Sequence, residues 1–248
     1  MITKAKTKHI RSLQKSKGRY SHNQFIIEGR RLVQEAVDAD HELVMSFFTR
    51  EFKKHYPEIV AGVMNICPTA QEISSSEMQS ISATKTPSGI FGVCILPTPH
   101  VFNDTHHSNW LYLDNISDPG NMGTLLRTAI WFDIYNIALS RDCVDIFHPK
   151  VVRSGMGAHF HISYILDADI TQFNSTHTLY GADPDGKSLD DFDIETPWAL
   201  VLGSEAHGIS KGIRKTIHGY IAVSRLGEGE SLNVAVAGGI IMDKLVKK

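Results

Sequence analysis

Apolar and polar residues in the first hundred positions alternate in blocks that match two kinds of element. Apolar runs at 25–28, 43–49 and 89–96 predict buried strands. The stretch 29–39 repeats its apolar residues on one helical face, and 74–81 lies in a Ser-rich capping context, so both predict helices. Strands that alternate with helices at this spacing predict a small α/β domain.

A polar segment without periodicity follows at 98–108, beside two prolines, and predicts a linker. It divides the chain into a first domain at 1–97 and a second domain at 109–248. With 248 residues, the chain is long enough for each of two domains to bury its own core.

The second domain begins with further apolar runs. The segments 110–114, 134–139, 179–181 and 198–202 predict buried strands, and 121–132 predicts a helix. This pattern predicts a doubly wound α/β domain around a parallel sheet. Ligands of such sheets bind beyond the carboxyl ends of the strands, so the residues after each run are candidates for a site.

Two polar turns, at 203–205 and 231–233, lie in the last part of the chain. Between them, 210–217 predicts a helix and 220–223 a strand, and 234–246 predicts a final helix rich in small residues. One interpretation is a ligand site built from backbone groups at the two turns. The other is an ordinary βαβ unit, since Gly and Ser occur in any turn. These residues alone leave both interpretations open.

The net charge of −2 conceals an uneven distribution. Residues 1–27 carry seven basic and no acidic side chains, and the remainder sums to −9, from 18 basic and 27 acidic residues. The basic segment is a candidate nucleic-acid contact, and 8–20 within it predicts a short helix that ends at Gly18. A solvated, partly disordered segment is the alternative. The seven basic residues are Lys4, Lys6, Lys8, Arg11, Lys15, Lys17 and Arg19.

The composition is that of an ordinary globular protein, with 42% apolar and 21% charged residues. No run of 18 apolar residues predicts a membrane span, and the polar N-terminus does not match a secretory signal. Three widely spaced cysteines, Cys67, Cys94 and Cys143, favour reduced thiols in the cytoplasm over a disulfide framework. The 13 histidines lack ligand spacing, so no metal site is expected.

Residues 181–188 formally match the phosphate-binding loop G-x-x-x-x-G-K-S. That loop aims successive backbone N–H groups at phosphate, whereas Pro184 has no N–H and Asp183 and Asp185 would repel an anion. An acidic turn is therefore expected here, and a P-loop nucleotide hydrolase is the least favoured function.

Three motifs occur in a fixed order: Asn121-x-Gly123-x-x-x-Arg127, Leu202-Gly203-Ser204-Glu205-x-x-Gly208 and Glu230-Ser231-Leu232-Asn233-Val234. They resemble the SpoU (TrmH) family of RNA ribose 2′-O-methyltransferases, in the SPOUT superfamily. Residues 148–158 resemble the family too, although Ser154 is displaced by one position from its pattern. Lys150 and Arg153 are expected on the RNA face, with the seven basic residues above. The N-terminal third, notably 25–29, resembles the substrate-binding domain of many members.

The resemblance implies an RNA substrate-binding domain followed by a trefoil-knotted SPOUT methyltransferase domain, with the knot formed by 180–240. It implies an S-adenosylmethionine-dependent enzyme that methylates a ribose 2′-hydroxyl, with ribosomal RNA (the large subunit above all) favoured over transfer RNA. A homodimer is expected, because the family completes its sites across a dimer interface. No membrane and no metal partner are expected. The alternatives are a transfer-RNA methyltransferase and a non-catalytic RNA-binding or ribosome-assembly factor that retains the fold.

By the same resemblance, the backbone of three loops holds the cofactor. The family has Ile-Pro or a similar pair nine residues before the motif leucine, where this chain has Val223-Ser224, so Ile221 competes with Val223 for that role. The glycines also have a purely conformational explanation. The residues implied are Leu202, Gly203, Ser204, Gly208, Val223, Ser231 and Leu232.

The catalytic residues implied are Arg127, Asn121, Glu205, Ser231 and Asn233. Family mechanisms propose the matching arginine as the base, but a guanidinium with a pKa above about 12 is a poor proton acceptor. We expect Arg127 to clamp a phosphate and stabilise the developing alkoxide, with Glu205 orienting it. Asn233 would position the hydroxyl or cap its helix. An ordinary surface salt bridge is the alternative for Arg127.

Overall fold

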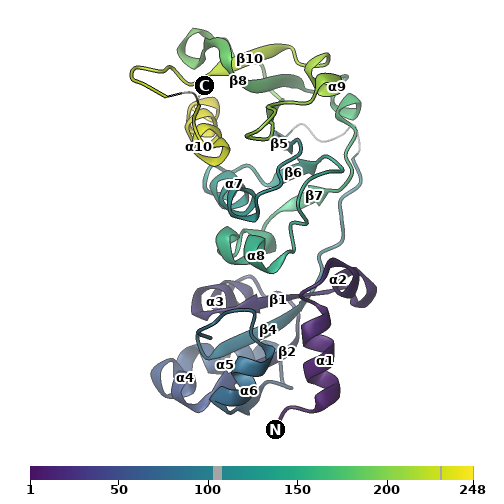
Figure 1. The fold of residues 1–248 in the computed structure, drawn as a ribbon, viewed down its shortest axis with the longest axis vertical. Coiled ribbons are helices and arrows are strands. Elements are labelled where there is room, and N and C mark those ends of the chain that lie inside the picture. Colours follow the sequence, from purple (N-terminus) through teal and green to yellow (C-terminus); the bar gives the residue numbers. More distant parts are fainter. Residues whose placement is uncertain (103–107, 230, 248) are drawn as a thin grey trace. The chain divides into compact units, whose positions relative to one another are not determined.

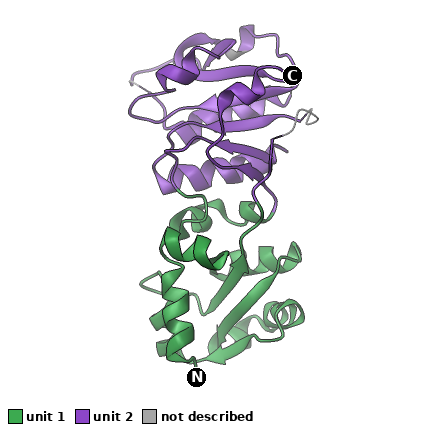
Figure 2. Cartoon of the chain, turned by 90° about the vertical axis from the view of Figure 1, so that its right-hand side faces the viewer, with its two compact units in different colours: residues 1–98, 145–160 green, residues 99–144, 161–248 purple. Residues whose placement is uncertain are grey.

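A computed structural model describes residues 1–102, 108–229 and 231–247 (Figure 1). The chain forms two compact units, shown in Figure 2. Unit 1 consists of residues 1–98 and 145–160, and unit 2 of residues 99–144 and 161–248.

The compact units differ from the predicted domains at one place. The prediction put residues 145–160 in the second domain, whereas the structure packs them into unit 1. Residues 103–107 of the predicted linker at 98–108 lie outside the described residues.

Unit 1 contains a four-stranded sheet in the order β1-β4-β2-β3. Strand β4 runs antiparallel to β1 and β2, and β3 runs parallel to β2. The strands are β1 (Gln24–Glu28), β2 (Leu43–Thr49), β3 (Gln71–Ile73) and β4 (Ile90–Ile95). The helices are α1 (Lys4–Ser12), α2 (Ser16–His22), α3 (Arg30–Asp38), α4 (Arg50–His55), α5 (Pro57–Ile66), α6 (Ser75–Ile81) and α8 (Pro149–Gly155), with a 3-10 turn η1 (Ala158–Phe160).

The strands predicted in the first domain are confirmed as β1, β2 and β4, and the helices at 29–39 and 74–81 as α3 and α6. Ser74 and Glu77 form a capping box at the start of α6, which explains why the Ser-rich segment begins a helix. The prediction for the basic segment is wrong in detail, because two helices form there and Gly18 lies inside α2. No element was predicted for residues 50–73, which form α4, α5 and β3.

Unit 2 contains a six-stranded sheet in the order β10-β8-β9-β5-β6-β7, and every pair in it is parallel. Its strands are β5 (Trp110–Leu113), β6 (Asn136–Leu139), β7 (Ser163–Ile165), β8 (Thr178–Ser188), β9 (Trp198–Leu202) and β10 (Gly219–Ala222). Its helices are α7 (Pro119–Trp131), α9 (Lys211–Arg214) and α10 (Val234–Leu245), with 3-10 turns η2 (Ile170–Phe173) and η3 (Leu189–Asp191).

The predicted doubly wound parallel sheet is confirmed. Every residue of the central strands β5 and β9 is buried, as expected for strands that are covered on both faces. The helix predicted at 210–217 is shorter, since α9 ends at Arg214. The trefoil knot stays a prediction.

The segment that formally matches a phosphate-binding loop is part of strand β8. A Cβ added to Gly186 would come within 2.6 Å of the Tyr220 backbone, so this glycine permits close pairing with β10. Extended backbone cannot cradle a phosphate in the way that a loop before a helix does. The acidic turn expected here is thus replaced by a strand, which lacks the loop-before-helix arrangement of the motif.

Helix α10 packs closely on α7 and on the end of β9. A Cβ added to Gly238 would lie 2.7 Å from Leu202 Cδ1 and 2.9 Å from Leu125 Cδ2. A glycine here therefore permits this approach without displacing the two leucine side chains. The contact brings Asn233, which precedes α10, beside the turn that follows β9.

Two findings concern the part of the chain that the structure describes. None of its helices has both the length and the apolar character that crossing a bilayer requires. Within those same residues, no group of three or more His, Cys, Asp or Glu side chains is arranged to hold a metal ion.

Candidate active site

A cavity of about 1020 Å³ lies at the carboxyl ends of the strands of unit 2. Four segments line it: the second half of β8, the turn after β9, the residues that follow β10, and the start of α10. Parallel α/β sheets bind their ligands at this edge. The cavity is thus large enough for a ligand of nucleotide size and lies where the strand pattern predicts one.

All seven residues predicted to bind the cofactor line this cavity. Leu202, Gly203, Ser204 and Gly208 come from the turn after β9, Val223 follows β10, and Ser231 and Leu232 precede α10. Residues about 30 positions apart in the sequence therefore share one cavity. Their contact with a cofactor stays a prediction.

The 203–209 turn is closed on itself. Gly208 N–H donates to Ser204 O at 2.8 Å, and His207 N–H donates to Ser204 Oγ at 3.2 Å. A Cβ on Gly203 would lie 2.2 Å from the Gly208 backbone, and Gly208 has a φ of +63°. The two glycines are therefore needed for the turn itself, which presents Glu205 at its exposed tip.

Glu205 joins two asparagines from distant parts of the chain. Asn121 Nδ2 donates to Glu205 Oε1, and Asn233 Nδ2 donates to Asn121 Oδ1 at 3.0 Å and to Glu205 Oε1 at 3.2 Å. We call these three residues the polar cluster. Each lies in a different one of the three sequence motifs, so the fold brings the three motifs together.

Local structure fixes two members of the polar cluster. Asp118 caps α7 by accepting the N–H of Asn121 at 2.8 Å. Asn233 caps α10, since its Oδ1 accepts the N–H of Ala235 at 2.9 Å. Asn233 therefore caps its helix, as its sequence position suggested, and also contacts Asn121 and Glu205. Its role in positioning a hydroxyl stays a prediction.

Arg127 lies apart from the polar cluster. It is exposed on α7, six residues after Asn121, which places the two side chains on different faces of the helix. Among the described residues, its guanidinium has no hydrogen-bond or ion-pair partner. The expectation that Glu205 orients Arg127 is not met within one chain, because the Glu205 carboxylate instead contacts Asn121 and Asn233.

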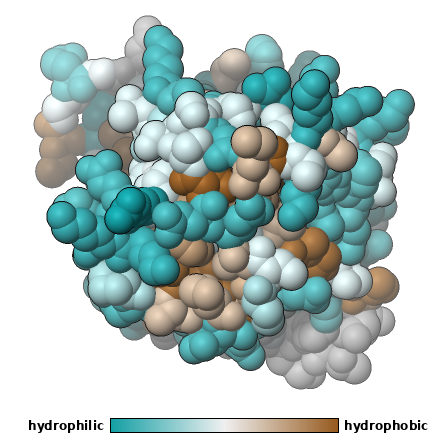
Figure 3. Space-filling view, turned by 90° about the horizontal axis from the view of Figure 1, so that it is seen from below, coloured by the Kyte–Doolittle hydropathy of each residue, from teal (hydrophilic) through white to brown (hydrophobic). Residues whose placement is uncertain are grey.

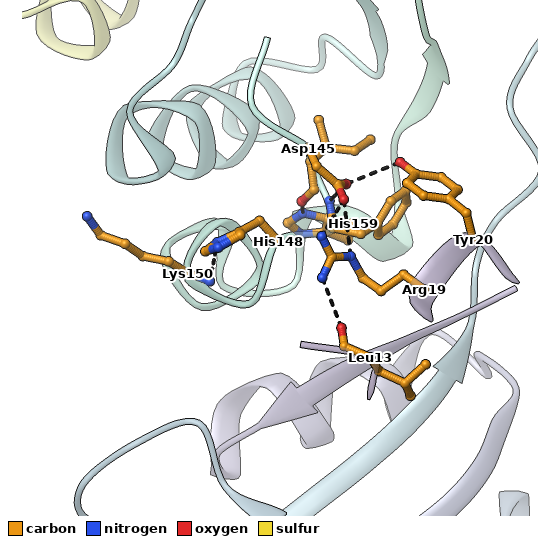
Figure 4. A network of polar contacts seen from close by, with 9 residues as sticks. Leu13, Arg19, Tyr20, Asp145, His148, Lys150 and His159 are labelled. Carbon is orange, nitrogen blue, oxygen red and sulfur yellow. Dashed lines mark hydrogen bonds and ion pairs between the residues drawn. The ribbon is translucent and has the colours of Figure 1, made fainter. Parts of the chain in front are cut away.

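Arg19 was predicted to bind RNA, and the structure contradicts this. The residue is 1% exposed, and its guanidinium forms an ion pair with Asp145 and donates to Leu13 O at 2.9 Å (Figure 4). The Asp145 carboxylate also accepts from Tyr20 OH at 3.2 Å and from Phe147 N at 2.8 Å. Arg19 therefore fixes the 145–160 segment within unit 1 and is not available to a phosphate.

The other six basic residues of 1–27 are exposed on or between α1 and α2. The alternative of a disordered segment is wrong for these helices, because Ile10 and Leu13 are fully buried in the core of unit 1. Lys150 and Arg153 lie on α8, in the same unit.

Two histidines near α8 have pKa values below the ordinary value for histidine. Burial, and then the charge of Arg19, lowers the pKa of His148, whose Nδ1 accepts the N–H of Lys150 at 3.2 Å. Burial lowers the pKa of His159 to about 4, although its ring hydrogen bond to Ile146 O raises it. The local sequence pattern did not reveal the burial of either histidine.

Comparison with known proteins supplies independent findings. Residues 108–243 match the model of the SpoU rRNA Methylase family, and residues 4–92 match the MRM3-like substrate binding domain. The 23S rRNA (guanosine(2553)-2'-O)-methyltransferase RlmP of Bacillus subtilis is 28% identical over 242 residues, which cover 96% of this chain and 94% of that protein. Mitochondrial rRNA methyltransferase 3 of Xenopus laevis is 34% identical over 177 residues, or 68% of this chain and 39% of that protein.

Solved structures show the same fold over the whole chain. A TrmH-family protein from Porphyromonas gingivalis has a TM-score of 0.85 and 30% identity, and the match covers 99% of this chain and 98% of that one. An AdoMet-bound rRNA methyltransferase from Sinorhizobium meliloti has a TM-score of 0.84 and 22% identity, with coverage of 100% and 96%.

Proposed function

The chain belongs to the SpoU rRNA methylase family, and from that premise we propose that it transfers a methyl group from S-adenosylmethionine to a ribose 2′-hydroxyl in RNA. The observation that supports this most strongly is the convergence of the three motifs on one site. We propose ribosomal RNA of the large subunit as the substrate, because the relative from B. subtilis is a 23S rRNA methyltransferase and aligns with nearly the whole chain.

The residues around the cavity fit the proposed cofactor. The volume of about 1020 Å³ accommodates a nucleoside with an amino-acid tail. Backbone groups of the 203–209 turn and of Val223 and Leu232 would hold it, and the tight Gly203–Gly208 contact keeps side chains out of the turn. When bound, the cofactor supplies an electrophilic methyl group.

The polar cluster would act on the ribose. Its carboxylate and two amides lie within hydrogen-bond distance of one another, so they can orient a ribose hydroxyl before the reaction. Such orientation of the reactants contributes much of the rate enhancement in group transfer. Arg127 would bind the phosphate next to that ribose and stabilise the negative charge that develops on its oxygen. Glu205 also lines the cavity, and it therefore connects the cofactor position with the asparagines.

We propose unit 1 as the main source of RNA affinity. It holds 15 basic and 10 acidic residues, a net charge of +5, whereas unit 2 holds 10 basic and 17 acidic residues, a net charge of −7. Figure 3, viewed from the end where the N-terminus lies, shows hydrophilic side chains over much of that face. Positive charge attracts RNA phosphates and releases counterions, so unit 1 suits this role better than unit 2.

We further propose that the enzyme works as a homodimer through α7 and α10. These two packed helices leave large apolar side chains in water: Trp131 is 83% exposed, Val236 52% and Ile240 38%. Exposed apolar surface of this kind is typical of an interface. Arg127 lies one turn from Trp131 on α7, so a second copy would bring partners to a guanidinium that has none among the described residues of one chain.

The test is methyl transfer from radiolabelled S-adenosylmethionine to ribosomal RNA, with the modified nucleotide mapped by 2′-O-methyl sequencing. Transfer to large-subunit RNA supports the proposal, and transfer to transfer RNA alone would change the substrate. RNA binding without any transfer would favour the non-catalytic factor. Calorimetry should show S-adenosylmethionine binding and no heat from ATP, and light scattering at micromolar concentration should show a dimer.

A further inference from the structure

Asp114 is a buried acidic residue for which neither the motifs nor the proposed function provides a role. It follows β5 at the carboxyl edge of the sheet and is 1% exposed. A buried carboxylate is unfavourable unless hydrogen bonds or a cation replace its hydration. Among the described residues, no basic side chain forms an ion pair with Asp114, so its hydrogen bonds must compensate.

Asp114 contacts both ends of the 203–209 turn. Its backbone N–H donates to the carbonyl of Leu202, the last residue of β9, at 2.8 Å. Its side-chain Oδ2 accepts the N–H of Ser210, directly before α9, at 2.6 Å. The second bond is short and charge-assisted, which is the stronger kind of hydrogen bond.

Internal contacts close the turn between these two hydrogen bonds. Hydrogen bonds and the close Gly203–Gly208 approach tie its two sides together, as described above. We therefore expect a change at the Ser210 end to shift the tip, where Glu205 contacts Asn121 and Asn233.

We propose that Asp114 is a positioning residue, which holds the 203–209 turn so that Glu205 reaches the polar cluster. It touches neither substrate nor cofactor and acts through Glu205. The effect on turnover rests on the proposed methyl transfer, whereas the effect on the turn does not.

The first experiment compares Asp114→Ala, Asp114→Asn and the exposed control Asp142→Ala, by turnover at saturating RNA and cofactor. Loss of a hydrogen bond to a charged group predicts that Asp114→Ala lowers turnover about 10- to 100-fold. Asp114→Asn keeps an oxygen that accepts the Ser210 N–H and should stay within about fivefold of wild type. Turnover of Asp142→Ala should be unchanged. Wild-type turnover in Asp114→Ala would overturn the proposal.

A double-mutant cycle tests whether Asp114 acts through Glu205. In a Glu205→Gln background, adding Asp114→Ala should lower turnover by less than about threefold, because the contact that Asp114 supports is already weakened. The same loss in both backgrounds would place its effect elsewhere and overturn the proposal. Ser210→Pro removes the donor instead of the acceptor, at a φ of −60° that proline adopts, and should reproduce the loss if Asp114→Ala fails to fold.

Hydrogen exchange of residues 203–210 supplies a readout that is independent of activity. Asp114→Ala should exchange the amides of this segment at least about tenfold faster than wild type, with Asp142→Ala unchanged. Unaltered exchange would overturn the proposal even if no methyl transfer were found, and that result would be separate from a failure of the proposed function.

Discussion

Asn233 makes two kinds of contact, and different substitutions separate them. Its Oδ1 caps α10 by accepting the N–H of Ala235, and its Nδ2 donates to Asn121 and to Glu205. Asn233→Ala removes both kinds. Asn233→Ser retains a capping hydroxyl, but the shorter side chain carries no amide to donate to Glu205.

The two losses differ in size and in what they affect. Loss of an N-cap costs about 1 kcal/mol of stability, and this corresponds to about 2–4 °C in Tm for a chain of this length. Loss of a hydrogen bond to a charged group costs about 1.5–3 kcal/mol, which corresponds to about a 10- to 150-fold fall in turnover if the cluster acts in the transition state. Asn233→Ala should show both effects, and Asn233→Ser only the second.

Thermal unfolding and steady-state methyl transfer measure the two effects on the same preparations, with cofactor binding followed by calorimetry. Full turnover in Asn233→Ser would show that the polar cluster has no part in the reaction. A Tm for Asn233→Ser as low as that of Asn233→Ala would instead refute the capping role.

Three further predictions follow from single features. Arg127→Ala should lower turnover about 100- to 1000-fold, the loss typical of a transition-state contact, with calorimetric cofactor affinity unchanged; turnover within a few-fold of wild type would exclude that role. Replacing Lys4, Lys6 and Lys8 together by Gln should reduce the slope of log K for RNA against log salt by about 2, at about 0.7 per single-strand phosphate contact, and an unchanged slope would mean that these residues are only solvated. Folding lowers the pKa of His159 from 6.5 to about 4, so the unfolded chain binds more protons than the folded chain between these pH values. The free energy of unfolding should therefore be highest above pH 6.5 and should fall by about 3 kcal/mol as the pH drops to 4. Urea unfolding at pH 7.5 and 4.5 checks this, and His159→Gln should show a shallower dependence.

The sequence by itself determined most elements, and its resemblance to a known family predicted the site residues. Apolar runs that end at polar turns gave β1, β2, β4, β5 and β9, because burial on both faces requires continuous apolar sequence. The three motifs resemble the family, and that resemblance pointed to seven residues that line the cavity. Helices α4 and α5 were missed, although Pro57 stands in the first turn of α5, a position that proline favours.

Only the tertiary structure decided which of these residues meet and which are buried. Asn121 and Glu205 are 84 positions apart, and Asn121 and Asn233 are 112 apart, and the parallel strand order and the close packing of α10 on α7 bring them together. Arg19 reads as one more charge in a basic segment, yet it is buried on Asp145, 126 positions away. Periodicity reports the burial pattern within one element, whereas pairing between distant elements depends on the order of strands in the sheet, and no local window of sequence contains that information.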